Sequence, residues 1–195
     1  MCGAVVLGWY VYAQGSAYVF QEREAGYFQV PVEQQLARRQ PNCGVPATRS
    51  GGPIGKIEVV NLGLSVVVLE GDDAHALRLG AGRIPWTAQP GQAGNIAIAA
   101  HRDTFFRPLR NIRQGDFIRL ITSAASYTYS VQWTKIVGPH DMEVTAATPG
   151  PTLTLITCYP FYYIGAAPNR FVVRAREIAT GPGAEPDWCR ASQAH

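Results

Sequence analysis

Residues 152–158 read TLTLITC, a run in which threonine and aliphatic residues alternate and which ends on a cysteine. Alternation with a period of two predicts a β-strand with one buried face. Tyr159 and Pro160 follow, and proline ends the hydrogen-bonded ladder because it has no backbone N–H. The sequence therefore predicts a thiol held at the end of a strand, at the rim of a sheet, and Cys158 is a candidate nucleophile.

Two further residues occupy comparable positions. His101 closes the apolar run NIAIAA of residues 95–100, and Arg170 comes just before the alternating run FVVRAR, from where it could reach over the rim. A cysteine nucleophile needs a proton donor for the leaving group and a group that stabilises the oxyanion. Histidine suits the first task and arginine, which stays charged, suits the second. Each residue alone is more often structural, so the prediction of a catalytic site depends on all three together.

Composition narrows the class of protein. A chain of 195 residues with 47% hydrophobic residues suits one domain with a sizeable core. Its net charge of +3 is far from the dense positive charge of nucleic-acid-binding proteins, so no nucleic-acid partner is expected. Arginines do gather between Arg102 and Arg119, but Asp103 and Asp116 interrupt them, which is typical of a solvated face. The four cysteines lack the spacing of a zinc site, and no phosphate loop or dinucleotide fingerprint occurs, so we predict no metal and no cofactor.

Short β-type runs bounded by Gly, Pro, Asn or Asp recur from residue 54 onward, and they predict a mostly β fold. The runs cover residues 54–60, 64–69, 95–100, 116–122, 127–137, 152–157 and 171–178. Helices are expected only near residues 72–79 and 105–110. A closed barrel would bury one face of each strand and hide the sheet edges. The expected organisation is an apolar N-terminal segment (1–20), a stalk and linker (21–53), a β-barrel (54–178) and a tail (179–195).

The N-terminal residues 2–13 form an uncharged apolar run with aromatic residues toward its end. A membrane-spanning helix needs about 20 apolar residues, so this run is too short to cross a bilayer. Three interpretations stay open: the outer part of a single membrane span, a shortened signal region, or a helix packed on the domain. In the first, the protein sits in the cytoplasmic membrane with the barrel outside. There, Cys43 and Cys189 could form a disulfide, although the sequence does not show that they meet.

Two segments, AHRDTFFRPL at residues 100–109 and LITCYPFYY at residues 155–163, resemble the signature of the sortases. These are membrane-anchored cysteine transpeptidases of bacteria, and the flanking residues are most similar to class D. The resemblance runs from about residue 54 to residue 178. It implies an eight-stranded β-barrel with short helices, in which His101, Cys158 and Arg170 surround a groove for an extended peptide.

The same resemblance implies an activity and partners. Cys158 would cleave an LPxTG-like sorting signal after its threonine and form a thioacyl enzyme, which an amine of a cell-wall precursor or a pilin lysine would resolve. Thr157 and Tyr159, which flank the cysteine, are candidate substrate-binding residues. Two departures bear on substrate preference and not on chemistry. RIPWT at residues 83–87 stands where many relatives have HIPGT, and Ala100 stands where glycine is usual.

Two alternatives to a transpeptidase remain at this stage. Water instead of an amine could resolve the thioacyl enzyme, which would make the protein a thiol endopeptidase. The chain could also be a non-catalytic surface β-barrel that binds peptides, with Cys158 buried in its core. Labelling of the native thiol separates the second alternative from both enzymes.

Overall fold

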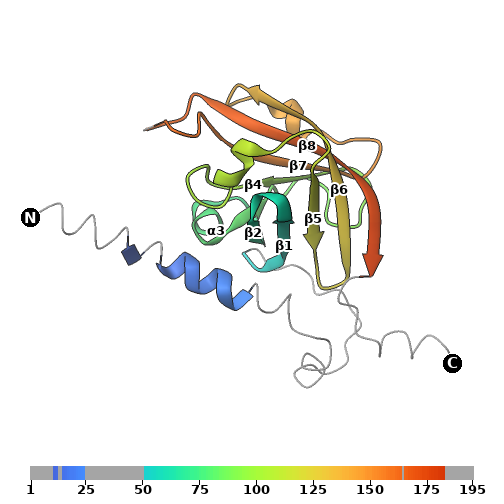
Figure 1. Ribbon diagram of the computed structural model, residues 1–195, viewed down its shortest axis with the longest axis horizontal. Helices are drawn as coiled ribbons and strands as arrows, with labels where there is room; N and C mark the ends of the chain where they lie inside the picture. The colour runs from blue at the N-terminus through green and yellow to red at the C-terminus, as the bar shows by residue number, and fades with distance from the viewer. Residues whose placement is uncertain (1–10, 13–14, 25–50, 164, 183–195) are drawn as a thin grey trace, which may run out of the picture.

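The computed structural model describes residues 11–12, 15–24, 51–163 and 165–182, and its described part forms a closed β-barrel (Figure 1). The order of the strands around the barrel is β1-β2-β3-β4-β7-β8-β6-β5. The strands are β1 Pro53–Val59, β2 Leu64–Glu70, β3 Ala81–Arg83, β4 Asn95–Ala99, β5 Phe117–Ile121, β6 Ala125–Val137, β7 Thr152–Tyr159 and β8 Asn169–Pro182. The prediction of a mostly β, closed eight-stranded barrel is confirmed.

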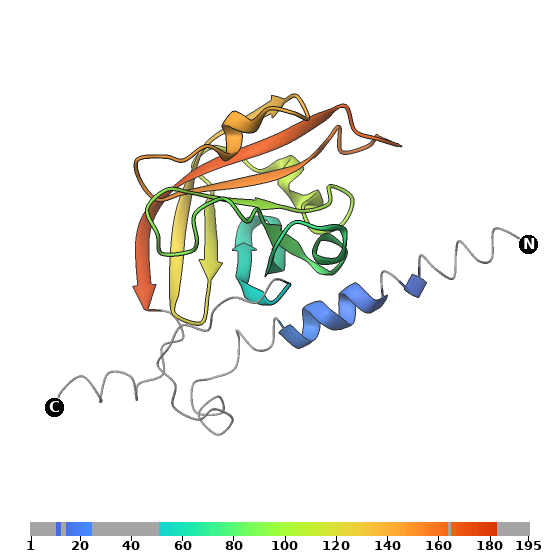
Figure 2. The ribbon, with the colours of Figure 1, turned by 180° about the vertical axis from the view of Figure 1, so that it is seen from behind.

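Alternating side chains build the core inside the barrel. In β7, Leu153 and Leu155 are fully buried in the central hydrophobic cluster, as the TLTLITC pattern predicts. The longest strands, β6 and β8, have 13 and 14 residues and pair from Ala125 with Pro182 to Val137 with Arg170. They form one wall of the barrel (Figure 2). β7 lies between β8 and β4; Cys158 and Arg170 lie on β7 and β8, and His101 follows the end of β4.

Short helices join the strands at the expected places. The helix α3 (Ala74–Leu79) begins after Asp73, whose carboxylate accepts hydrogen bonds from the backbone N–H groups of His75 and Ala76 at 2.8 and 3.0 Å. The 3-10 helix η2 (Arg107–Asn111) overlaps the second predicted region, residues 105–110, and extends one residue beyond it. Two further 3-10 turns are η1 (Val60–Leu62) and η3 (Met142–Thr145).

Two details differ from the sequence-based expectation. The strand β3 has only three residues and no alternating pattern, and it pairs in parallel with β2 through Val68 and Ala81. Arg170 was expected just before its strand, but it lies inside β8, which begins at Asn169. That prediction was wrong because the ladder with β7 continues through the polar residues on both strands as far as Tyr159 and Asn169.

Residues 15–24 form a helix that lies against the barrel near α3 (Figure 1). Gln21 fixes it there, since its amide nitrogen donates to the Leu79 carbonyl oxygen at 2.6 Å and its amide oxygen accepts from the Val67 N–H at 2.7 Å. A Cβ atom at Gly80 would lie 2.9 Å from that amide nitrogen, so the glycine leaves room for the contact. These contacts support a packed helix for residues 15–24.

The rest of the N-terminal apolar run, residues 1–10, lies outside the described part of the chain, as do Cys43 and Cys189. Within the described residues, none of the helices has both the length and the apolar character that a bilayer crossing requires.

Candidate active site

Strand register brings the three predicted residues together. β7 and β8 are antiparallel, and Cys158 is directly opposite Arg170. β4 and β7 are parallel, and their ladder ends with Ala99 beside Ile156. Beyond that point the Thr157 hydroxyl donates to the Ala100 carbonyl oxygen at 2.7 Å, which keeps the chain leaving β4 next to β7. Two residues past Ala99 and Ile156 come His101 and Cys158, so Cys158 and Arg170 on β7 and β8 lie at about the same level as His101, just beyond the end of β4.

The three side chains also share a face. Leu155 points into the core, and alternation therefore turns Cys158 to the outside of the barrel. Arg170 faces the same way, because directly opposed residues of an antiparallel pair lie on one side of the sheet. Ala100 belongs to the core cluster, whereas the next residue, His101, is exposed. The candidate site therefore lies on the outer face of the sheet, at the ends of β7 and β8 and just beyond the end of β4.

The solvent exposure of the outer face of β4, β7 and β8 differs along the strands. Thr154 and Val172 are fully buried, although both face outward. The segment that contains η3 meets this face at Asn95, whose amide nitrogen donates to the carbonyl oxygens of Val144 and Ala146 at 3.0 Å. Arg174 holds that segment by donating to the Val144 carbonyl oxygen at 2.9 Å. Cys158 is half-buried and is a free thiol. The outer face is thus open at the end where the three predicted residues lie.

Only part of the Arg170 guanidinium is used in hydrogen bonds within the described residues. Its Nη1 donates to the carbonyl oxygens of Ala167 and Asn169 at 3.2 and 3.0 Å. A guanidinium carries five N–H donors, and in the described part of the chain Nε and Nη2 of Arg170 make no hydrogen bond. Those groups can meet an oxygen that gains negative charge next to Cys158.

The two predicted substrate-binding residues face the other way. Thr157 is only 2% exposed, and its hydroxyl is used in the contact with Ala100. Tyr159 is half-buried and packs on Phe161 and Phe171, with ring centroids 6.1 and 6.4 Å away. Both residues support the strand that carries Cys158, and their contact with substrate stays a prediction.

Sequence reasoning missed Arg102, which it treated as part of a solvated face. Its Nη2 donates to the carbonyl oxygens of Tyr163 and Gly165, at 2.6 and 3.1 Å. Both belong to the β7–β8 loop, residues 160–163 and 165–168, which runs from just after Cys158 to just before Arg170. The position of Arg102 next to His101 is the only feature of the sequence that could have indicated its role. Its partners are backbone carbonyl groups, which every residue type has, so the sequence does not identify them.

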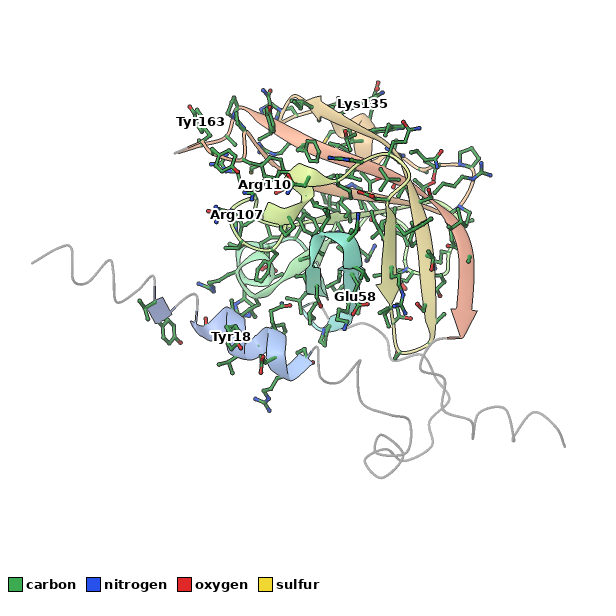
Figure 3. The ribbon with its side chains drawn as sticks, viewed as in Figure 1. Tyr18, Glu58, Arg107, Arg110, Lys135 and Tyr163 are labelled. Atoms are coloured by element: carbon green, nitrogen blue, oxygen red, sulfur yellow. The ribbon has the colours of Figure 1, made fainter. Side chains whose placement is uncertain are left out.

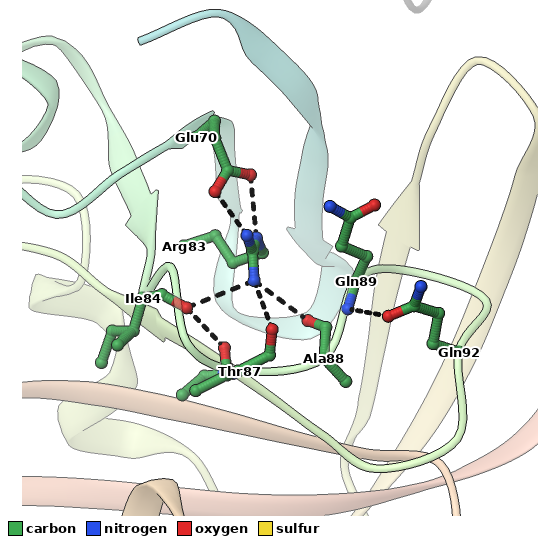
Figure 4. A network of polar contacts seen from close by, with 8 residues as sticks. Glu70, Arg83, Ile84, Thr87, Ala88, Gln89 and Gln92 are labelled. Carbon is green, nitrogen blue, oxygen red and sulfur yellow. Dashed lines mark hydrogen bonds and ion pairs between the residues drawn. The ribbon is translucent and has the colours of Figure 1, made fainter. Parts of the chain in front are cut away.

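The departure at residues 83–87 has a structural explanation (Figure 4). Arg83 is 3% exposed and makes a two-pronged ion pair with Glu70, in which Nε is 2.8 Å from Oε2. Its Nη1 also donates to the carbonyl oxygens of Ile84, Thr87 and Ala88. Arg83 therefore organises the loop between β3 and β4. Trp86 on this loop is 64% exposed and does not pack beneath the site.

Comparisons with known proteins give a consistent result. The family model described as the sortase domain matches residues 57–178. Sortase D of Bacillus subtilis (strain 168) is 34% identical over 130 residues, which are 66% of each chain. The structure of sortase E from Streptomyces avermitilis is 31% identical with a TM-score of 0.60, and the match covers 69% of this chain and 93% of that one.

A Clostridium perfringens Sortase D5 transpeptidase has the same fold, with a TM-score of 0.68 at 24% identity over 85% of this chain and 99% of that chain. The chain spans less than two thirds of the curated relatives it matches, namely 66% of one and 54% of the other.

Proposed function

The chain belongs to the sortase family, and on that premise we propose that it is a cysteine transpeptidase of the class D type. The register that sets Cys158 opposite Arg170 and beside the end of β4, where His101 follows, is the observation that carries the proposal. A nucleophile, a proton carrier and a fixed positive charge are the three parts that acyl transfer from a peptide requires.

In the first half of the reaction, the Cys158 thiolate attacks the carbonyl carbon of the threonine in an LPxTG-like sorting signal. The electron pair of the carbonyl moves to its oxygen, which the free Nε and Nη2 donors of Arg170 stabilise. The C–N bond then breaks, and protonated His101 gives its proton to the departing glycine amine. The product is a thioester on Cys158.

In the second half, an acceptor amine attacks the thioester carbonyl and its proton passes to His101. The carbon–sulfur bond breaks, which restores the thiolate and leaves the sorting-signal protein joined to the acceptor through a new amide. The acceptor is an amine of a cell-wall precursor or a pilin lysine. We further propose that the N-terminal apolar segment anchors the protein in the cytoplasmic membrane, with the barrel on its outer side, where both substrates are found.

The partial exposure of Cys158 bears on the non-catalytic alternative, because a peptide-binding barrel with an inert core cysteine would bury the thiol. A variant in which Cys2, Cys43 and Cys189 are replaced by serine leaves one thiol to react. We expect a water-soluble alkylating reagent to modify Cys158 in the native state of this variant. Modification only after unfolding would favour the alternative.

The test of the reaction itself is an incubation with a library of LPxTG-like peptides and candidate amines, with the products identified by mass. We expect a ligation product, and none from Cys158→Ala. His101→Ala and Arg170→Ala should each lower kcat/KM by at least ~10²–10³, since one preorganised oxyanion donor typically contributes that much. Full turnover by Cys158→Ala would refute the proposal. Hydrolysis alone, in the presence of every amine, would favour the endopeptidase.

A further inference from the structure

Arg102 joins the two segments that border the candidate site. It follows His101 directly on one side, and on the other it binds the carbonyl oxygens of Tyr163 and Gly165 in the β7–β8 loop. Its guanidinium carbon also lies 5.8 Å from the centre of the Tyr163 ring, within the range of a cation–π contact. Arg102 is half-buried, and its Nη1 atom is buried without a hydrogen-bond partner among the described residues.

The loop that Arg102 binds in turn holds Arg170. Nη1 of Arg170 donates to the Ala167 carbonyl oxygen at the far end of the loop and to the carbonyl oxygen of Asn169, the first residue of β8. Register fixes only the backbone of Arg170 opposite Cys158, and a long side chain can still point in many directions. The direction of the guanidinium therefore depends in part on where the loop places the Ala167 carbonyl group.

Other contacts fix the loop less firmly. At its base, Phe161 packs edge-on against Phe171, with ring centroids 5.3 Å apart. Farther along, Arg110 of η2 lies 5.5 Å from the centre of the Tyr162 ring, but Tyr162 is 76% exposed. Figure 3 shows Tyr163 near the end of the loop, above the segment that carries Arg107 and Arg110. The hydrogen bonds from Arg102, like the one from Arg170 to the Ala167 carbonyl oxygen, are charge-assisted, and such bonds are about twice as strong as neutral ones.

We infer that Arg102 is a positioning residue for Arg170. It fixes the β7–β8 loop, and the Ala167 carbonyl group of that loop helps to hold the Arg170 guanidinium beside Cys158 with Nε and Nη2 free for the oxyanion. Arg102 itself touches neither the reacting thiol nor the peptide carbonyl. The inference rests on the proposed function, because it assigns Arg102 a role through the proposed role of Arg170.

A kinetic cycle with the full chain tests this. Arg102→Ala should lower kcat/KM by about 10–10²-fold, mainly through kcat, because small misplacements of an oxyanion donor are costly. The loss should not exceed that of Arg170→Ala. In the Arg170→Ala background, Arg102→Ala should change kcat/KM by no more than about twofold, the usual scatter of independent effects. If Arg102→Ala lowered kcat/KM in the Arg170→Ala background as much as in the wild type, the inference would be overturned, because Arg102 would then act independently of Arg170.

The matched control is Arg107→Ala, which removes the same charge from the same segment. The Arg107 side chain is exposed and makes no polar contact within the described residues, so kcat/KM should stay unchanged. Arg102→Lys keeps the positive charge but lacks the planar guanidinium group, and its kcat should lie between those of Arg102→Ala and the wild type. Urea unfolding midpoints of the three variants exclude a general loss of structure as the cause.

A second readout does not depend on activity. NMR relaxation of the Tyr163 and Gly165 amides and of the Arg170 Nε–H group should show larger motions in Arg102→Ala than in Arg107→Ala. Unchanged relaxation in Arg102→Ala would overturn the inference even in an active enzyme. A wild-type chain without transpeptidase activity would refute the proposed function, while the relaxation data would still decide whether Arg102 holds the loop and Arg170.

Discussion

Replacing Arg83 with methionine is expected to lower the free energy of unfolding by about 3–5 kcal/mol, the usual cost of breaking a buried ion pair from one side. The Arg83 side chain is 4% exposed and that of Glu70 is 12% exposed, so methionine would leave a nearly buried carboxylate without its partner. The carbonyl oxygens of Thr87 and Ala88 would lose their donor as well. The Ile84 carbonyl oxygen keeps two donors, the Thr87 hydroxyl at 2.7 Å and the Thr87 backbone N–H at 3.1 Å.

A double-mutant cycle separates the ion pair from the loop contacts. Glu70→Leu should also destabilise the protein, because it leaves the guanidinium buried without a counter-ion. The combination of Glu70→Leu with Arg83→Met should cost less than the sum of the single changes, by about 0.5–3 kcal/mol, since it removes both charges together. Part of the loss should remain, because no donor is left for the loop carbonyl groups.

The measurement is urea unfolding at neutral pH of the wild type, both single variants and the double variant. Arg119→Met is the control, since Arg119 is 47% exposed and pairs with Glu58 at 3.5 Å, and such surface pairs contribute about 0–1 kcal/mol. An Arg83→Met variant within about 1 kcal/mol of the wild type would refute the reasoning, because that is the range of an exposed pair. Strict additivity in the cycle would show that the two charges do not interact.

Two further predictions concern stability and the N-terminal helix. Tyr129 is fully buried and its hydroxyl has no hydrogen-bond partner among the described residues, so Tyr129→Phe should raise the free energy of unfolding by about 1 kcal/mol in urea at neutral pH. Burial, and then the charge of Glu177, raise the pKa of Tyr129 in the folded state, so the wild type keeps its full stability below the unfolded pKa of about 10 and loses stability as the pH rises above it. Tyr129→Phe should therefore lose less stability than the wild type in alkaline solution, and equal losses would contradict this cause. Gln21→Ala should speed hydrogen exchange of the Val67 amide by roughly five- to tenfold, because its acceptor is gone. Unaltered exchange there would mean that the helix of residues 15–24 does not protect β2.

The sequence predicts most of the barrel because most strands bury one face. Seven alternating or apolar runs coincide with seven strands, whose buried side chains must recur every second residue. The strand β3 could not be predicted in this way, because it has three residues and its conformation depends on distant backbone. A Cβ at Gly82 would lie 2.2 Å from the Gly71 carbonyl oxygen, so glycine is required there by a contact that no local pattern reveals.

For the site, sequence reasoning identified the residue types but not their orientation. Cys158 and His101 could be found because they end apolar runs, whereas the position of Arg170 inside β8 depends on the register with β7. Register follows from the length and path of the connecting loop, which residue types do not specify. Arg102 was missed for a related reason, since its partners are backbone oxygens 61 and 63 residues away.

The contacts of the site divide into two groups that can change independently. The barrel core fixes the Cα positions of Cys158 and Arg170 through the β7–β8 ladder. The direction of the Arg170 guanidinium depends also on the loop, through the Ala167 carbonyl oxygen, and among the described loop residues Phe161 is the one that packs on the core. Substitutions among the other loop residues should therefore move this guanidinium, the proposed oxyanion donor, at little cost in stability. Substitutions in the core strands would disturb the cysteine and the arginine together, because the ladder holds both.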